Sequence, residues 1–205
     1  KSVKVELTGR CNYRCGFCAL RSREKQPTED MDFDFFKRIA SDMRKSGVEE
    51  IGLFYLGESF MNPDLLVKAI AYSKEIGFPY VFLTSNASLA DPETVERCFM
   101  GGLDYLKWAV KGCDGEQLKD VMGVKPKLYH QAFNNIKAAK AVRDAWNYDC
   151  GLYASSIMYD GEQHERMVEL LEREVIPYVD QHYWLPLYSM GSVATLREKE
   201  LGYRP

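Results

Sequence analysis

Six short apolar runs alternate with five amphipathic segments along the chain, and this alternation limits the folds open to it. Strand, helix and strand in regular succession predict right-handed crossovers and a parallel sheet covered by helices. The predicted strands cover residues 3–8, 50–56, 79–84, 104–110, 149–158 and 180–187. The predicted helices cover residues 32–46, 63–76, 91–100, 128–145 and 162–175.

Local signals mark where three of these helices begin. Asp32 is a capping residue, and Asn62 and Asp91 each precede a proline, which is favoured at the first helical position because its missing N–H would be unpaired there anyway. Six such units predict an α/β fold, either a doubly wound sheet or a barrel with some units missing, and spacing alone does not choose between them. No repeat or linker interrupts the pattern, so we expect one domain over residues 1–191 and a trailing segment over residues 192–205 that begins a possible carboxyl-terminal extension.

Composition narrows the class of protein. The 205 residues are 46% hydrophobic, which is enough for one substantial core. The net charge of −3, without a basic stripe, argues against a nucleic-acid partner. No apolar run reaches the roughly 18 residues that a membrane span needs, and the amino terminus does not resemble a signal peptide. We therefore expect no membrane partner and a cytoplasmic location.

Three cysteines lie within eight residues, directly after the first predicted strand: Cys11, Cys15 and Cys18. Structural zinc and ordinary iron–sulfur carriers normally use four protein ligands, so three thiolates leave one coordination position open for chemistry. A structural zinc site completed by a distant histidine is the alternative, and the chain has three histidines. A disulfide is disfavoured by the odd number of neighbouring cysteines.

Polar and reactive residues follow the other predicted strands as well. The carboxyl ends of parallel strands meet at one edge of the sheet, so these residues predict a single active face. After the second to sixth strands they are Gly57-Glu58-Ser59, Ser85-Asn86, Lys111-Gly112-Cys113-Asp114, Ser155 to Tyr159, and Tyr188-Ser189-Met190-Gly191.

The pattern Cys11-x3-Cys15-x2-Cys18 after a first strand, with Phe17 before the last cysteine and Gly57-Glu58 ending the second strand, resembles the radical S-adenosylmethionine (radical SAM) superfamily. The stretch that begins at Gly57 is similar to the branch with cysteine-rich carboxyl-terminal extensions, the SPASM and twitch proteins. The resemblance implies a partial (β/α)6 barrel similar to a TIM barrel. It spans nearly the whole chain.

The resemblance also implies an activity and its cofactors. In such oxidoreductases a [4Fe-4S] cluster held by three cysteines binds S-adenosylmethionine at the fourth iron. One electron from the cluster then releases methionine and a 5′-deoxyadenosyl radical, which abstracts a hydrogen atom from the substrate. The implied partners are a small-molecule substrate such as a sugar or nucleoside, or a peptide, and an electron donor such as flavodoxin or ferredoxin.

By the same resemblance, Cys11, Cys15 and Cys18 are the expected cluster ligands and Phe17 is expected against the adenine. Gly57 and Glu58 are expected at the methionine ammonium, which suits a carboxylate. Ser85 and Asn86 are expected near the methionine carboxylate and the ribose. A solvated loop acid at Glu58 and a turn at Ser85 and Asn86 are the structural alternatives.

The fourth strand departs from the pattern. Many relatives have Ser-x-Asp-Gly there, whereas this chain has Ala109-Val110-Lys111-Gly112. Lys111 is therefore a candidate to bind a substrate carboxylate or phosphate, or the cofactor carboxylate, and a lysine that reaches solvent is the alternative. Cys113 is a candidate to return a hydrogen atom to a product radical, against a plain loop cysteine. Cys98 and Cys150 are expected to be ordinary buried residues.

Several aromatic residues are candidates to line a substrate pocket or to fill the barrel: Tyr55, Tyr153, Tyr159, Tyr183, Trp184 and Tyr188. Two other functions remain open from the sequence. One is a non-catalytic metal or iron–sulfur module that braces a loop for partner binding. The other is a relative that binds S-adenosylmethionine without cleaving it, which the altered fourth strand motivates.

Overall fold

The computed structural model describes residues 1–16, 18–20, 25–112, 119 and 122–186. Six parallel strands form one sheet in the order β1-β2-β3-β4-β5-β6. The strands are β1 (Ser2–Lys4), β2 (Glu50–Gly52), β3 (Tyr80–Ser85), β4 (Tyr105–Val110), β5 (Gly151–Ile157) and β6 (Gln181–Leu185). Because each strand pairs with the next one in the chain, the alternation of the sequence maps directly onto the sheet.

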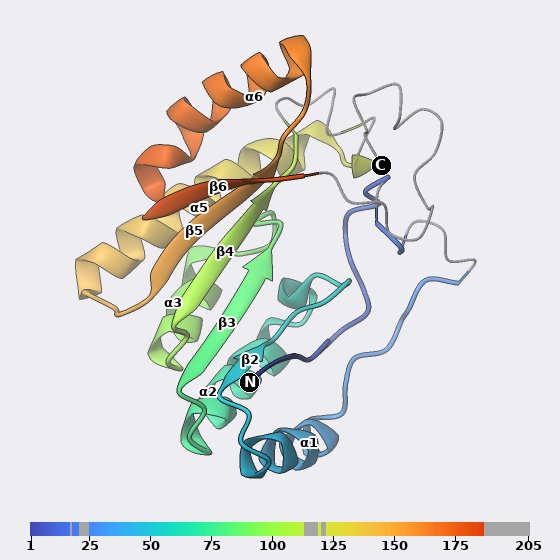
Figure 1. Cartoon of the computed structure of the whole chain (residues 1–205), viewed down its shortest axis with the longest axis vertical. Helices are drawn as coiled ribbons and strands as arrows, with labels where there is room; N and C mark the ends of the chain where they lie inside the picture. Colours follow the sequence, from blue (N-terminus) through green and yellow to red (C-terminus); the bar gives the residue numbers. More distant parts are fainter. Residues whose placement is uncertain (17, 21–24, 113–118, 120–121, 187–205) are drawn as a thin grey trace.

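Helices connect the strands and cover the outer, convex face of the sheet (Figure 1). They are α1 (Phe33–Lys45), α2 (Pro63–Glu75), α3 (Pro92–Met100), α5 (Pro126–Trp146) and α6 (Gly161–Glu174), with short 3₁₀ turns η1 (Ser59–Met61) and η2 (Ile176–Tyr178). Within the described residues β1 and β6 are not paired, so the curved sheet is an open, partial barrel. The fold class expected from the resemblance is confirmed.

The three predicted helix starts are confirmed by their capping bonds. The side chains of Asp32, Asn62 and Asp91 accept hydrogen bonds from backbone N–H groups three residues ahead. Each bond satisfies a donor that the first turn of a helix leaves unpaired. The start of each helix is therefore fixed by residues adjacent to it in the sequence.

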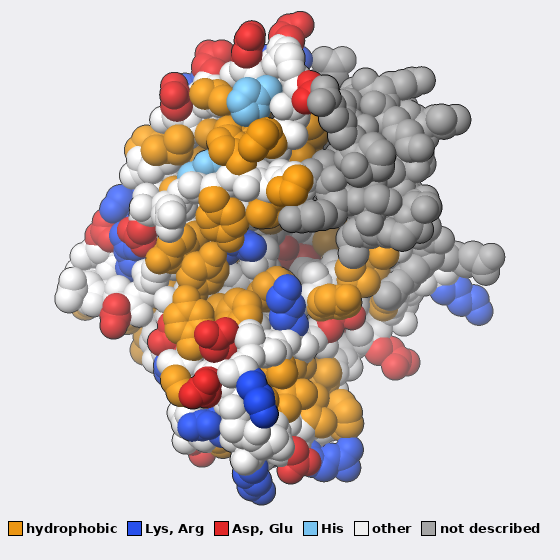
Figure 2. All heavy atoms as spheres, viewed as in Figure 1, with side chains coloured by type: hydrophobic (Ala, Val, Ile, Leu, Met, Phe, Trp, Pro, Cys, Tyr) orange, Lys and Arg blue, Asp and Glu red, His pale blue; other side chains and the backbone are white. Residues whose placement is uncertain are grey.

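Residues on the strands alternate between two environments. On β4, Leu106 and Trp108 are fully buried against the helices, whereas Tyr105, Lys107 and Ala109 face the concave side and are partly exposed. The concave face carries a run of aromatic rings in which Tyr105 stacks on Tyr153 with ring centroids 4.3 Å apart. Figure 2 looks onto this face, where apolar side chains gather around a hollow.

The first two strands are shorter than predicted. β1 ends at Lys4 and β2 at Gly52, although the apolar runs continue to residues 8 and 56. Leu53 N–H still bonds to the carbonyl of Phe82 on the neighbouring strand, whereas the N–H groups of Leu56 and Gly57 bond to the Glu6 side chain instead of to a strand. Of the helices that the structure describes, none has the length and apolar content needed to cross a membrane.

Candidate active site

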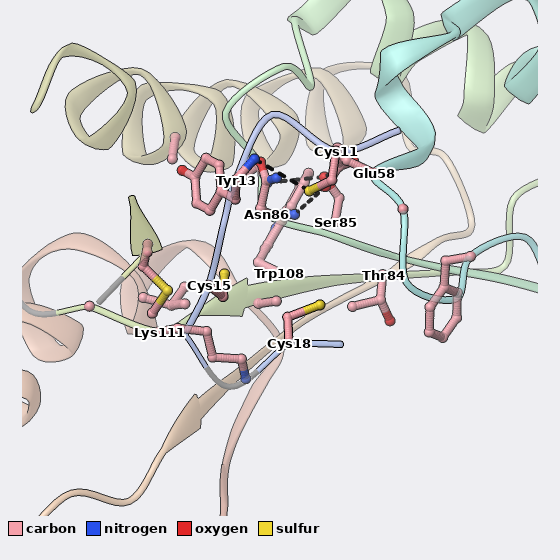
Figure 3. A pocket seen from close by; sticks show the side chains of 18 of the residues that line it. Cys11, Tyr13, Cys15, Cys18, Glu58, Thr84, Ser85, Asn86, Trp108 and Lys111 are labelled. Atoms are coloured by element: carbon pink, nitrogen blue, oxygen red, sulfur yellow. Dashed lines mark hydrogen bonds between the residues drawn. The ribbon is translucent and has the colours of Figure 1, made fainter. Parts of the chain in front are cut away.

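A cavity of about 240 Å³ opens at the carboxyl ends of the strands (Figure 3). Its walls come from segments that lie far apart in the sequence: the cysteine loop after β1, the ends of β2, β3 and β4, and one face of α5. All three cysteines of the loop line it, together with Gly57, Glu58, Ser85, Asn86 and Lys111. The predicted meeting of these residues at one edge of the sheet is confirmed for the described part of the chain.

The cysteine loop is held by contacts from outside its own sequence. Arg14 N–H donates to the carbonyl of Met122, at 2.8 Å. Arg10 binds Asp30 with both Nε and a terminal nitrogen, at 3.0 and 2.6 Å, and Asn62 donates to the same carboxylate. Burial opposes ionisation of Asp30, but these donors outweigh it and lower its pKa. These contacts therefore fix the backbone of the loop that carries the thiols.

The thiols lie in a desolvated setting and close to one another. Burial raises the pKa of Cys11 to about 11, although a hydrogen bond from Tyr13 N–H to its sulfur opposes the rise. Burial and the neighbouring thiols raise the pKa of Cys15 as well. A bound metal centre must therefore displace these protons and supply positive charge.

The donor set fits an iron–sulfur cluster better than a single ion. In the described residues no three Cys, His, Asp or Glu side chains are placed to hold one metal ion. The cysteine ligands of a [4Fe-4S] cluster each bind a different iron, so they need to surround a cluster rather than converge on a point. Cys11, Cys15 and Cys18 line the cavity without converging on one point, and this arrangement suits a cluster.

Gly57 brings the end of β2 against the cysteine loop. A Cβ atom at this position would lie 1.9 Å from the carbonyl oxygen of Thr8, so only glycine allows the approach. Glu58 N–H donates to the carbonyl of Arg10 at 2.8 Å, and the Glu6 carboxylate accepts from Leu56 N–H and Gly57 N–H. The loop after β2 (residues 53–58, the β2 loop) is thus attached to the cysteine loop by its backbone.

Glu58 is a buried carboxylate, not a solvated loop acid. Its oxygens accept from the Ser85 hydroxyl at 2.9 Å, from Asn86 N–H at 2.8 Å and from Phe60 N–H at 3.2 Å. Burial raises its pKa in spite of these three donors. A cationic group in the cavity would offset the remaining cost of burying this charge.

Ser85 and Asn86 turn mainly toward protein groups. The Ser85 hydroxyl donates to Glu58 and accepts from Ala87 N–H. The Asn86 side chain donates to Asn12 in the cysteine loop and accepts from Ser88. The structure therefore places both residues at the cavity wall, where they join β3 to the β1 and β2 loops.

Lys111 directly follows the last residue of β4 and lines the cavity rather than reaching solvent. Its Nζ lies 3.3 Å from the carbonyl oxygen and 3.4 Å from the hydroxyl of Ser155, and its own carbonyl accepts from the Tyr159 hydroxyl at 2.7 Å. Burial, together with the charge of Lys107, lowers the pKa of Lys111 to about 7. This amine is poised to gain a proton when an anion approaches.

Some predicted residues lie elsewhere. Cys98 and Cys150 are buried away from the cavity, as expected. Trp184 packs against His164 and His182 beneath α6, whereas Tyr55 lines the cavity mouth and is 61% exposed. Phe17, Cys113, Tyr188 and residues 192–205 lie outside the described residues, so their expected roles stay predictions.

Sequence reasoning missed the residues that act through tertiary contacts. Glu6, Arg10 and Asn12 carry no motif of their own. The side-chain partners that tie Arg10 and Asn12 to other segments lie 20 to 76 residues away, and Glu6 binds backbone groups about 50 residues away. The α5 residues in the wall, Tyr129, Ala132, Phe133 and Ile136, read only as the apolar face of a helix. Thr84 also lines the cavity. Its position one residue before Ser85, a predicted site residue, is the sequence signal that could have identified it.

Comparison with known proteins shows which proteins the chain is similar to in sequence. The family model described as "Radical SAM superfamily" matches residues 5–173. A GTP 3′,8-cyclase of Synechococcus sp. (strain CC9902) is 25% identical over 196 residues, covering 87% of this chain and 55% of the relative. The S-adenosylmethionine-dependent nucleotide dehydratase RSAD2 of Oncorhynchus mykiss is 32% identical over 118 residues, covering 55% of this chain and 31% of the relative. The chain thus spans about half or less of these relatives.

Solved structures share the fold. Streptococcus suis SuiB bound to S-adenosylmethionine superposes with a TM-score of 0.71 and 16% identity, over 94% of this chain and 42% of SuiB. SuiB bound to its precursor peptide SuiA gives a TM-score of 0.73 and 17% identity, over 96% and 42% of the two chains. At this level of identity the likeness concerns the fold alone.

Proposed function

Because the chain belongs to the radical SAM superfamily, we propose that it cleaves S-adenosylmethionine reductively at the cavity described above and uses the resulting radical to take a hydrogen atom from a substrate. Membership confirms the family and its two cofactors, a [4Fe-4S] cluster and S-adenosylmethionine. When bound, the cluster supplies the electron that splits the sulfonium bond.

One observation carries the proposal. The three thiols and the buried Glu58 carboxylate lie at least forty residues apart in the chain, and they line the same cavity. The thiols are the groups that bind a cluster with one open position, and a desolvated carboxylate beside them suits the ammonium of an amino acid. A loop-bracing metal module needs the thiols and has no use for the carboxylate.

The roles of individual residues follow from what each one contacts. Cys11, Cys15 and Cys18 bind the cluster. Glu58, held by Ser85 and Asn86, accepts from the methionine ammonium, and Gly57 keeps this carboxylate next to the cysteine loop. Phe17 lies against the adenine in the proposal, as the resemblance implies.

The cavity walls also exclude water from the reacting groups. Trp108 is fully buried, and Phe133 and Ile136 of α5 are nearly so. An apolar wall of this kind limits side reactions of a reactive intermediate by keeping other molecules away from it.

The substrate and the partners belong to the proposal too. Among the relatives and neighbours, the cyclase and the dehydratase are named for nucleotides and SuiB is seen with a precursor peptide. We therefore propose a small-molecule or peptide substrate and an electron donor of the flavodoxin or ferredoxin kind, in the cytoplasm and without a nucleic-acid partner. Cys113 is proposed as a hydrogen donor to the product radical.

The test is the formation of 5′-deoxyadenosine. Protein with its cluster reconstituted under anaerobic conditions, reduced and mixed with S-adenosylmethionine, is expected to release 5′-deoxyadenosine and methionine in equal amounts, measured by chromatography with mass detection. The control is the same protein without reductant. An intact cluster that yields no 5′-deoxyadenosine, with reductant present, would contradict the proposal and favour a relative that binds the cofactor without cleaving it.

A further inference from the structure

Two lysines, one on β4 and one just after its last residue, face the concave side of the sheet and lie at different depths. Lys107 pairs in register with Thr84 on one side and Tyr153 on the other, and its Nζ lies 5.6 Å from the ring centroid of Tyr183. Lys111 lies four residues further along the chain, about 13 Å away for extended backbone, and Ala109 lies between the two. Alternation along the strand places all three on the same face.

Neither lysine has an acidic partner in the part of the chain that the structure describes. Other lysines in that part do have one: Lys74 binds Asp104 and Lys137 binds Glu174. The electrostatic neighbours of Lys111 are Lys107, which repels its charge, and Cys15. An anion bound between the two ammonium groups would offset both their mutual repulsion and the cost of burying their charge, and no acidic side chain among the described residues does this.

Hydroxyl groups flank the same part of the wall. The Thr84 hydroxyl is buried and has no hydrogen-bond partner in the described structure, and Thr84 lies beside Lys107 in register. Ser155 lies beside Ala109, between the two lysines, with its hydroxyl 3.4 Å from Lys111 Nζ. Buried polar groups are normally paired, so the Thr84 hydroxyl indicates a ligand on this wall.

From this arrangement we propose that Lys107 and Lys111, with the hydroxyls of Thr84 and Ser155, bind the phosphate of a small phosphorylated substrate. The inference rests on the proposed function and names the substrate class of that site. A phosphate group carries up to two negative charges, which match two ammonium groups, whereas a single carboxylate carries only one. A substrate held in this way lies below the rim that the cofactor occupies in the proposed function.

The test is anion binding to the reconstituted protein with S-adenosylmethionine present, measured by isothermal titration calorimetry with inorganic pyrophosphate. Pyrophosphate is expected to bind, and both Lys107→Met and Lys111→Met are expected to weaken it about tenfold, since each removes one charged donor. Binding should also weaken as the salt concentration rises. Circular dichroism and iron content report whether each variant is folded and loaded.

A matched control is Lys4→Met. Lys4 also faces an aromatic ring on the concave side, with Nζ 5.3 Å from the ring centroid of Phe54, but it lies on β1, three strands from β4. This variant is expected to bind pyrophosphate like the unaltered protein. If Lys4→Met and Lys107→Met weaken pyrophosphate binding equally, the effect comes from the net charge of the protein, and the proposed site is overturned.

Two further probes separate the ligand classes. Malonate carries two carboxylates, and hexaglutamate stands for an acidic peptide. Tighter binding of either than of pyrophosphate would overturn the phosphate assignment, and so would a folded Lys107→Met variant with unchanged pyrophosphate affinity. Calorimetry needs no electron transfer, so pyrophosphate binding in a protein that forms no 5′-deoxyadenosine would contradict the proposed function alone.

Discussion

Replacing Cys15 by alanine is expected to remove the cluster. Cys15 lines the cavity between the other two thiols in sequence, and two thiolates cannot hold three corners of a [4Fe-4S] cluster. Loss of a hydrogen-bond partner of a metal ligand already lowers metal affinity by about tenfold or more, and loss of the ligand itself should lower it at least as much. We therefore expect the iron content of reconstituted Cys15→Ala protein to fall by about tenfold or more. Iron and sulfide analysis, with the visible absorption of the cluster, measures the effect.

Cys98→Ala is the matched control for this change. Cys98 is fully buried in α3 and does not line the cavity. Its removal should leave the iron content unchanged and cost only the packing of one small side chain. Full iron content in Cys15→Ala would contradict the assignment of the three thiols as ligands.

Replacing Gly57 by alanine should damage both the fold and the site. The new Cβ would meet the backbone oxygen of Thr8 at 1.9 Å, and this backbone cannot move without shifting the residues before Cys11. We expect a loss of about 3 kcal/mol in the free energy of unfolding, because forced overpacking costs this much when the neighbour is rigid. Urea denaturation of the protein measures the loss.

Gly47→Ala separates this clash from the ordinary cost of replacing glycine. Gly47 has a φ of +81°, and nothing lies within 4 Å of a Cβ built there. Only the left-handed backbone is strained in this variant, which costs about 1 kcal/mol. Equal destabilisation of the two variants would show that the approach of the β2 loop to the cysteine loop is not tight.

The parts of the fold that could be predicted are those encoded by neighbouring residues. The capping bonds of Asp32, Asn62 and Asp91 span three residues, so the starts of their helices were predicted to within one residue. The end of β2 was placed four residues too late, because Leu53 to Leu56 are apolar without being regular strand. The backbone beyond the strand bonds instead to the carboxylate of Glu6, which lies fifty residues before Leu56 in the chain.

The candidate site also has a part that local sequence predicts and a part that depends on long-range contacts. The cysteine spacing and the Gly57-Glu58 pair are local patterns, and both were located from the sequence. The bonds that orient them join Arg10 to Asp30 and Asn12 to Ser88, and the burial of Lys111 depends on its neighbours in the folded sheet. Such contacts follow from the register of the sheet, which no single segment encodes.

The most direct test of the account is the electron paramagnetic resonance spectrum of the reduced, reconstituted protein with and without S-adenosylmethionine. The account holds that three protein thiols leave one iron open and that the cofactor takes this position beside Glu58. It therefore predicts that S-adenosylmethionine changes the g-values of the cluster signal. Identical spectra at saturating S-adenosylmethionine would contradict the account.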